Sequence, residues 1–367
     1  MPRIDVFLQL AREQGGSDIH LTVGLPPMLR LEGRMSALKY RTLDAAETAD
    51  LLGEIIPPHR REELARRGAI DLCYTAAGVG RFRINIYRQS RGMAAACRVI
   101  AERAPRLADL GLPQVVTHFT QMRSGLVLVT GGVGTGKSTT LAAMIEEINQ
   151  TRSATILTLE DPIEVMHESK KSLIMQREVG THVHSFAAGL HAGLREDPDI
   201  ILVGELRDPE TIALAVEASE TGHLVLGTLH TRGAYQTIHR ITDAFPAGAQ
   251  SQIRHTLAEN LKAVVSQELL RTFDGRGRRA AVEVLVVNAA IAQLIRESKT
   301  HQIPSAISTG RRFGMQLLDQ ALLAMVKAGE IDPDDAFTRA TDKQECARFV
   351  TQPELRALAE TTASTPN

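Results

Sequence analysis

Apolar and polar residues repeat at strand and helix periods in the first hundred residues. Residues 18–23 alternate apolar and polar side chains, and this period of two predicts a half-buried strand. Residues 4–14 place apolar side chains on one face at helical spacing, which predicts a helix. Further strands are predicted at residues 28–31, 70–74, 81–87 and 93–100, and helices at residues 45–55 and 60–67. This part of the chain is therefore expected to form a small α+β domain.

The pattern changes beyond residues 101–106, a polar stretch that contains a helix-breaking proline. Short apolar runs separated by helical patterns follow, and they predict the buried strands of a mostly parallel sheet, with ligands at the carboxyl ends of its strands. The predicted strands are residues 126–130, 155–159, 200–203, 224–227 and 282–287, the helices are residues 139–148 and 316–327, and residues 352–367 are expected to fray. We therefore predict two domains, residues 1–104 and residues 105–367.

Composition and charge exclude several classes of protein. Lys and Arg number 42 against 43 Asp and Glu, so the net charge of -1 provides no bulk field for nucleic acid or an anionic membrane. Aromatic residues are 4% with no Trp, which disfavours a base-stacking surface. The three cysteines are far apart and form no C-x-x-C pair, which disfavours a disulfide framework or a tetracysteine zinc site. No apolar run is long enough to span a bilayer, so we expect a cytoplasmic protein with no nucleic-acid partner and no direct membrane insertion.

A phosphate-binding motif lies between a predicted strand and a predicted helix. The sequence GGVGTGKS at residues 131–138 matches G-x-x-x-x-G-K-[ST], and a glycine-rich turn with an incidental lysine would not require this strand and helix. Backbone N–H groups of such a loop cradle phosphates, Lys137 reaches the β and γ phosphates, and the Ser138 hydroxyl ligates Mg²⁺. We predict binding of ATP with Mg²⁺ by Gly131, Gly132, Val133, Gly134, Thr135, Gly136, Lys137, Ser138 and Thr139.

Carboxylates follow two of the predicted strands. Glu205 comes after the strand at residues 200–203, where it could deprotonate the attacking water; the alternative is a solvated glutamate. Residues 160–164 contain three more carboxylates, including Glu164. On the pattern alone they indicate either a water-orienting site or a solvated turn at Asp161-Pro162, and both interpretations stay open.

Histidines and arginines supply further candidates. His223 and His230 flank the predicted strand at residues 224–227 and could sense the γ phosphate or link subunits, although a single histidine is usually structural. No nearby cysteine completes a zinc site with them. Arg81 and Arg83 alternate with apolar residues and fall on one strand face, a pattern that ordinarily indicates a solvated surface. Hydrolysis nevertheless needs positive charge at the γ phosphate, and the phosphate loop contains no arginine.

Together these motifs resemble the type IV pilus retraction ATPases, the PilT-like twitching motility proteins of the secretion ATPase superfamily. The resemblance rests on SDIHL at residues 17–21, GLPPM at 24–28, the phosphate loop, ILTLEDPIEVMHE at 156–168, LREDPDIILVGELRD at 194–208 and ETGHLVLGTLHT at 220–231. It implies an α/β fold in which a RecA-like P-loop ATPase domain follows a small α+β, PAS-like N-terminal domain. It also implies a homo-hexameric ring that hydrolyses ATP, contacts an inner-membrane pilus platform protein at the cytoplasmic base of the pilus machinery, and retracts the pilus.

The resemblance also assigns roles to residues. It implies that Glu205 is the Walker B catalytic glutamate, that Glu164 is the Asp box glutamate, and that His223 and His230 are nucleotide-site or coupling residues. Arg81 and Arg83 are implied to face phosphate, and residues 253–257, with Arg254, resemble a motif associated with retraction.

Two departures and two alternatives accompany this interpretation. Gly132-Val133 replaces the family's usual Pro-Thr, and residues 232–235 replace its usual small hydroxyl residues. An assembly-type secretion or pilus-extension ATPase is one alternative, but such proteins typically carry a tetracysteine zinc element. A nucleotide-gated accessory ring with little turnover is the other.

Overall fold

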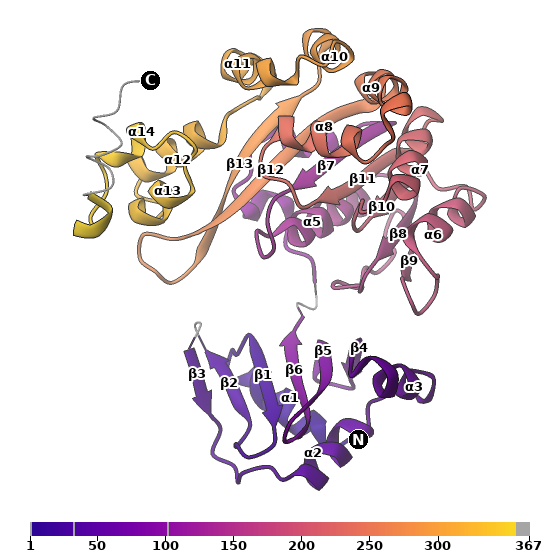
Figure 1. The fold of residues 1–367 in the computed structure, drawn as a ribbon, viewed down its shortest axis with the longest axis vertical. Coiled ribbons are helices and arrows are strands. Elements are labelled where there is room, and N and C mark those ends of the chain that lie inside the picture. Colours follow the sequence, from indigo (N-terminus) through magenta and orange to yellow (C-terminus); the bar gives the residue numbers. More distant parts are fainter. Residues whose placement is uncertain (1, 32–33, 101–102, 357–367) are drawn as a thin grey trace. The chain divides into compact units, whose positions relative to one another are not determined.

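The computed structural model describes residues 2–31, 34–100 and 103–356, and its contacts divide the chain into two compact units (Figure 1). The first unit comprises Met1–Arg103 and Pro162–Met166, and the second comprises Ala104–Asp161 and His167–Asn367. Part of the predicted linker, residues 101–102, and most of the predicted frayed tail, residues 357–367, lie outside the described residues. Among the described residues, no helix has the length and apolar character needed to cross a membrane.

The first unit is an antiparallel sheet packed against helices. Its strand order is β3-β2-β1-β6-β5-β4. The alternation in β5 buries Phe82, Ile84 and Ile86 completely and leaves Arg81 and Arg83 partly exposed on the other face, as the sequence predicts. The elements are β1 (Asp18–Thr22), β2 (Met28–Leu31), β3 (Arg34–Ala37), β4 (Ala69–Ala76), β5 (Gly80–Gln89) and β6 (Gly92–Val99), with α1 (Ile4–Glu13), α2 (Ala45–Gly53) and α3 (Pro58–Arg67).

The second unit is built on a seven-stranded sheet of order β13-β12-β7-β11-β10-β8-β9. All neighbouring strands pair in parallel except β12 and β13, so the prediction of a mostly parallel sheet is confirmed. The strands are β7 (Gly125–Thr130), β8 (Thr155–Glu160), β9 (Leu173–Glu178), β10 (Ile200–Val203), β11 (Leu224–Leu229), β12 (Leu261–Arg271) and β13 (Arg278–Val286).

Helices cover both faces of this sheet, which explains why its central strands are continuously apolar. In β7, Val127 and Val129 pack against α5 (Lys137–Thr151), whereas Leu126 and Leu128 join the core on the opposite face, and all four are fully buried. The opposite face is covered by α6 (Phe186–Gly193), α7 (Pro209–Glu220), α8 (Ala234–Asp243), α9 (Ala247–Asn260), α10 (Ala289–Arg296) and α11 (Ile303–Thr309).

The remaining helices lie at the start of the second unit and near its end. Helix α4 (Val115–Phe119) and a 3₁₀ helix at Leu107–Leu110 join the core around α5. Helices α12 (Leu318–Lys327), α13 (Pro333–Arg339) and α14 (Gln344–Ala347) pack with the distal part of the β12–β13 hairpin in a separate apolar cluster. Two more 3₁₀ helices span Thr300–Gln302 and Arg311–Phe313.

The sequence analysis does not predict three of the observed strands, β3, β9 and β12. Of these, β12 matters most for the site. Its apolar pattern is interrupted by Ser266, Gln267 and Glu268, yet all three residues are buried, and Ser266 pairs with Thr130 of β7. The other two, β3 and β9, are edge strands with little fully buried surface. Strand β12, which the sequence pattern did not reveal, supplies part of the site described next.

Candidate active site

The polar residues predicted to act on phosphate gather at the carboxyl edge of the second unit's sheet. In the parallel pairing of β7 with β11, Thr130 lies opposite Leu229. The phosphate loop, residues 131–138, follows Thr130, and His230 follows Leu229. Glu205 follows β10, the strand on the other side of β11. The sheet therefore brings together three motifs that are far apart in the sequence.

The phosphate loop is fixed against β12 by Gln267. Gln267 Nε2 donates to Thr135 O at 2.7 Å, and its Oε1 accepts from Thr140 Oγ1 at 2.9 Å. A side chain at Gly136 would meet Gln267 Nε2, and one at Gly131 would collide with the Gln267 carbonyl. Both glycines also have positive φ, 142° for Gly131 and 89° for Gly136. Glycine is required here by backbone conformation and by the close approach of β12.

The ammonium group of Lys137 lies inside this loop. Its Nζ donates to Gly131 O at 2.9 Å and to Gly132 O at 2.7 Å, and it lies 3.5 Å from His230 Nδ1. Lys137 is buried at the first position of α5, where the helix N-terminus adds positive potential. The Lys137 ammonium group and the N-terminus of α5 thus both contribute positive potential within the phosphate loop.

Glu205 is held between His230 and an arginine. His230 Nε2 lies 3.4 Å from Glu205 Oε1, and Arg207 Nη2 lies 2.7 Å from Glu205 Oε2. Burial raises the pKa of the Glu205 carboxyl, but the hydrogen bond and charge of Arg207, together with His230, outweigh it and lower the pKa below its usual value. Glu205 is therefore ionised at neutral pH. Because Lys137 can only donate, the neutral His230 tautomer that fits accepts at Nδ1 and donates from Nε2 to Glu205.

Arg207 was not among the predicted site residues. Its second guanidinium nitrogen, Nη1, lies 3.9 Å from Asp161 Oδ2, so Arg207 connects the acid after β10 to an acid after β8. The sequence signal was available, because Arg207 lies only two positions after Glu205. The pair was missed because the pattern does not show that the two side chains point toward each other.

The other predicted residues belong to the first unit or to the opposite edge of the second unit's sheet. Arg81 and Arg83 are on β5 in the first unit, where Arg83 Nη1 lies 3.8 Å from Glu164 Oε1. His223 precedes β11 at its amino end, and its Nδ1 contacts Ala218 O at 2.9 Å. The six residues of β11 separate His223 from His230, so they are at opposite edges of the sheet, and His223 is outside the group around Lys137.

The exposed residues of the loop are compatible with a phosphate-bound cation. Ser138 and Thr139 are exposed at the first turn of α5, and Val133 is 91% exposed. Among the described residues, no group of three or more His, Cys, Asp or Glu side chains is arranged to hold a metal. Mg²⁺ commonly takes only one or two protein ligands and completes its coordination with water and substrate phosphates. A hydroxyl such as that of Ser138 fits this kind of coordination.

Comparisons with known proteins place this chain among secretion and pilus proteins. Residues 77–345 match the family model described as type II/IV secretion system protein. The chain is 48% identical over 318 residues to a "Twitching motility protein" of Neisseria gonorrhoeae, covering 87% of this chain and 85% of that one. It is 45% identical over 337 residues to the "Type IV pilus retractation ATPase PilT" of Pseudomonas aeruginosa, covering 92% and 98%.

A solved structure supports the same relationship. It is described as "Crystal Structure of the Pilus Retraction Motor PilT and Bound ADP" and is similar with a TM-score of 0.87 and 44% identity, covering 95% of this chain and 99% of that one. The predicted fold class, a RecA-like α/β domain preceded by a small α+β N-terminal domain, is confirmed.

The two hydrogen bonds that Gln267 makes with Thr135 and Thr140 predict that its substitution weakens nucleotide binding. Gln267→Leu removes both side-chain hydrogen bonds and leaves Thr135 O without its amide donor, so we expect nucleotide affinity to fall by about tenfold. Titration with a fluorescent ATP analogue measures this change, and Gln121→Leu at an exposed position is the control. Unchanged affinity in a folded Gln267→Leu protein would show that the loop keeps its conformation without these hydrogen bonds.

Proposed function

Because this chain belongs to the family of type II/IV secretion system proteins, we propose that it is an ATP-hydrolysing motor that powers the retraction of type IV pili. The observation that carries the chemistry is the contact of His230 with both Lys137 and Glu205, which joins a phosphate-binding cation to an ionised carboxylate. The direction of work is supported by relatives whose names specify twitching motility and pilus retraction.

Each residue at this edge has a distinct proposed role. Backbone N–H groups of the phosphate loop bind the phosphates of ATP, and Lys137 exchanges the carbonyls of Gly131 and Gly132 for β and γ phosphate oxygens. Glu205 orients and deprotonates the attacking water, and His230 holds this carboxylate relative to Lys137. Mg²⁺, with Ser138 as a hydroxyl ligand, neutralises phosphate charge when it is bound.

Four further residues have proposed roles in hydrolysis or coupling, three of them in the first unit. Glu164 is proposed to orient the attacking water, as the Asp box glutamate. Arg81 and Arg83 are proposed to supply the positive charge that the phosphate loop lacks, either to their own subunit's nucleotide or to a neighbour's. His223, at the opposite edge of the sheet, is proposed to couple subunits and not to bind nucleotide.

The proposed assembly is a homo-hexameric ring at the cytoplasmic base of the pilus machinery. Each subunit would contribute an N-terminal PAS-like domain of residues 1–104 and an ATPase domain of residues 105–367. The ring would be peripheral to the inner membrane, where it contacts the platform protein of the pilus. Arg254, on α9, is proposed to couple hydrolysis to retraction.

Substitutions at the two central residues separate binding from hydrolysis. We expect Lys137→Ala to abolish nucleotide binding or turnover, because the charge at the β and γ phosphates is lost. Glu205→Gln should bind nucleotide normally and lose at least about a hundredfold in phosphate release, because it cannot accept a proton. Nucleotide titration and steady-state phosphate release measure the two effects. Near wild-type turnover in Glu205→Gln would assign the base elsewhere, and no turnover in the wild type at any concentration would favour an accessory ring.

Arg207 predicts a change in the pH dependence of turnover. Glu205 acts as a base only when ionised, so turnover rises with pH through its pKa. Without Arg207, burial raises this pKa with less opposition, and Arg207→Gln should move the acidic limb of the kcat profile to higher pH. Arg240→Gln, at an exposed position on α8, should leave the profile unchanged. An acidic limb that stays in place in Arg207→Gln would contradict this role.

Deletion in cells tests the direction of work. A retraction motor removes pili, so cells that lack this protein should keep surface pili, or display more of them, and lose twitching unless a second motor replaces it. Arg254→Ala should give the same phenotype with substantial ATPase activity, because this residue lies outside the hydrolytic group. Pilus counts by electron microscopy and a motility assay provide the measurements. Cells without pili would identify an assembly-type ATPase instead.

A further inference from the structure

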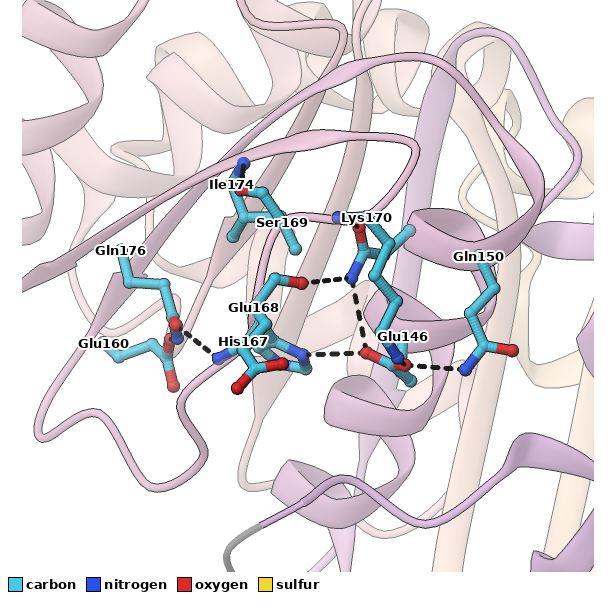
Figure 2. A network of polar contacts seen from close by, with 10 residues as sticks. Glu146, Gln150, Glu160, His167, Glu168, Ser169, Lys170, Ile174 and Gln176 are labelled. Carbon is cyan, nitrogen blue, oxygen red and sulfur yellow. Dashed lines mark hydrogen bonds and ion pairs between the residues drawn. The ribbon is translucent and has the colours of Figure 1, made fainter.

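A polar network in the second unit connects α5, the helix that begins in the phosphate loop, to the segment that follows Glu164. Figure 2 shows it, with Gln176 beside Glu160 and His167, and with Glu146 and Gln150 on the helix that begins in the phosphate loop. We call residues 161–166 the Glu164 loop. Residue 160 before this loop and residue 167 after it belong to the second unit, whereas Pro162–Met166 group with the first.

The residues after the Glu164 loop are fastened to α5. Asn149 is fully buried, and its Nδ2 donates to Glu168 O at 2.8 Å while its Oδ1 accepts from Lys170 N at 2.9 Å. Lys171 N donates to Asn149 O at 3.0 Å. Lys170 also forms an ion pair with Glu146. Residues 168–171 are therefore held against α5 by hydrogen bonds and an ion pair.

The imidazole of His167 is packed into the same region. Its side chain is 4% exposed, and Nδ1 lies 3.6 Å from Glu146 Oε2. Burial lowers the pKa of His167 and outweighs the opposing effect of Glu146, so the ring is neutral at physiological pH. A neutral, buried ring fixes where the Glu164 loop ends without introducing a charge.

A single side chain bonds both ends of the Glu164 loop. Gln176, on β9, accepts from His167 N at 2.8 Å through Oε1 and donates to Glu160 Oε1 at 3.2 Å through Nε2. Thr158 Oγ1 donates to the same Glu160 oxygen at 2.7 Å, and Thr158 lies opposite Gln176 in the β8–β9 pairing. The amide of Gln176 thus closes the base of the loop that carries Glu164.

We propose that Gln176 is a positioning residue for Glu164. It keeps residues 160 and 167 together, so the six-residue loop between them has fewer conformations, and the Glu164 carboxylate reaches its working position more often. This inference rests on the proposed hydrolytic function and adds a residue that does not contact the nucleotide. If Gln176 only stabilised β9, substituting it would lower the stability of the protein, and its effect on turnover would be the same with or without the Glu164 carboxylate.

A double-mutant cycle with Glu164 tests the proposal. Gln176→Met retains side-chain length and removes the hydrogen bonds to His167 N and to Glu160, and we expect kcat to fall about tenfold with a nucleotide Kd within about twofold of wild type. In a Glu164→Gln background, Gln176→Met should change single-turnover phosphate release by less than about twofold, because the group it positions is already lost. Gln150→Met is the matched control, since Gln150 Nε2 bonds Glu146 Oε1 at 2.6 Å on the exposed side of α5 but bonds neither end of the loop.

Amide hydrogen exchange gives a second measurement that needs no catalysis. Residues 161–168 should exchange faster in Gln176→Met and at the wild-type rate in Gln150→Met. Gln176→Glu, which keeps an acceptor for His167 N and opposes the Glu160 carboxylate, gives the same test if the Met variant does not fold. A full independent effect of Gln176→Met on top of Glu164→Gln, or unchanged exchange in both Gln176 variants, overturns the inference. A wild-type protein that releases no phosphate contradicts the proposed function, and the exchange result still decides whether Gln176 closes the loop.

Discussion

The parallel pairing of β7 with strands on both of its sides is the constraint on which the site depends. Pairing with β11 places His230 beside the start of the phosphate loop, and pairing with β12 places Gln267 directly against that loop. A side chain at Gly131 would collide with the Gln267 carbonyl, and one at Gly136 would displace the Gln267 amide. The conformation of the phosphate loop is consequently a property of the whole sheet and not of the eight-residue motif alone.

Four polar side chains are in contact, one after another, along the edge of the sheet that this pairing creates. Lys137 contacts His230, His230 contacts ionised Glu205, and Glu205 is bound to Arg207. A change at one member therefore alters the electrostatic environment of the next. Gln176 on β9 bonds both ends of the loop that carries Glu164, and the segment after this loop is bonded to α5. The phosphate loop, Glu205 and the Glu164 loop thus follow strands of one sheet. Helix α5 begins in the phosphate loop and also bonds the segment after the Glu164 loop.

The sequence predicted the parts of this site that are contiguous. A strand, a glycine-rich motif and a helix in succession are sufficient to identify the phosphate loop, and the apolar strand before Glu205 places that residue at the same edge. Gln267 and Gln176 could not be recognised in this way, because their partners are distant in the sequence and buried glutamine has no distinctive pattern. His223 shows the converse, since it is close to His230 in the sequence but a full strand separates them in space.

A crystal structure with a non-hydrolysable ATP analogue and Mg²⁺ would show whether Lys137 and Glu205 act together on the γ phosphate. We expect Lys137 Nζ to leave the carbonyls of Gly131 and Gly132 for the β and γ phosphate oxygens. We also expect a Glu205 oxygen within about 3.2 Å of a water positioned to attack the γ phosphate. An analogue bound away from residues 131–138, or a Lys137 that still contacts both carbonyls while Glu205 faces no water, would show that these residues do not bind and hydrolyse ATP in this way.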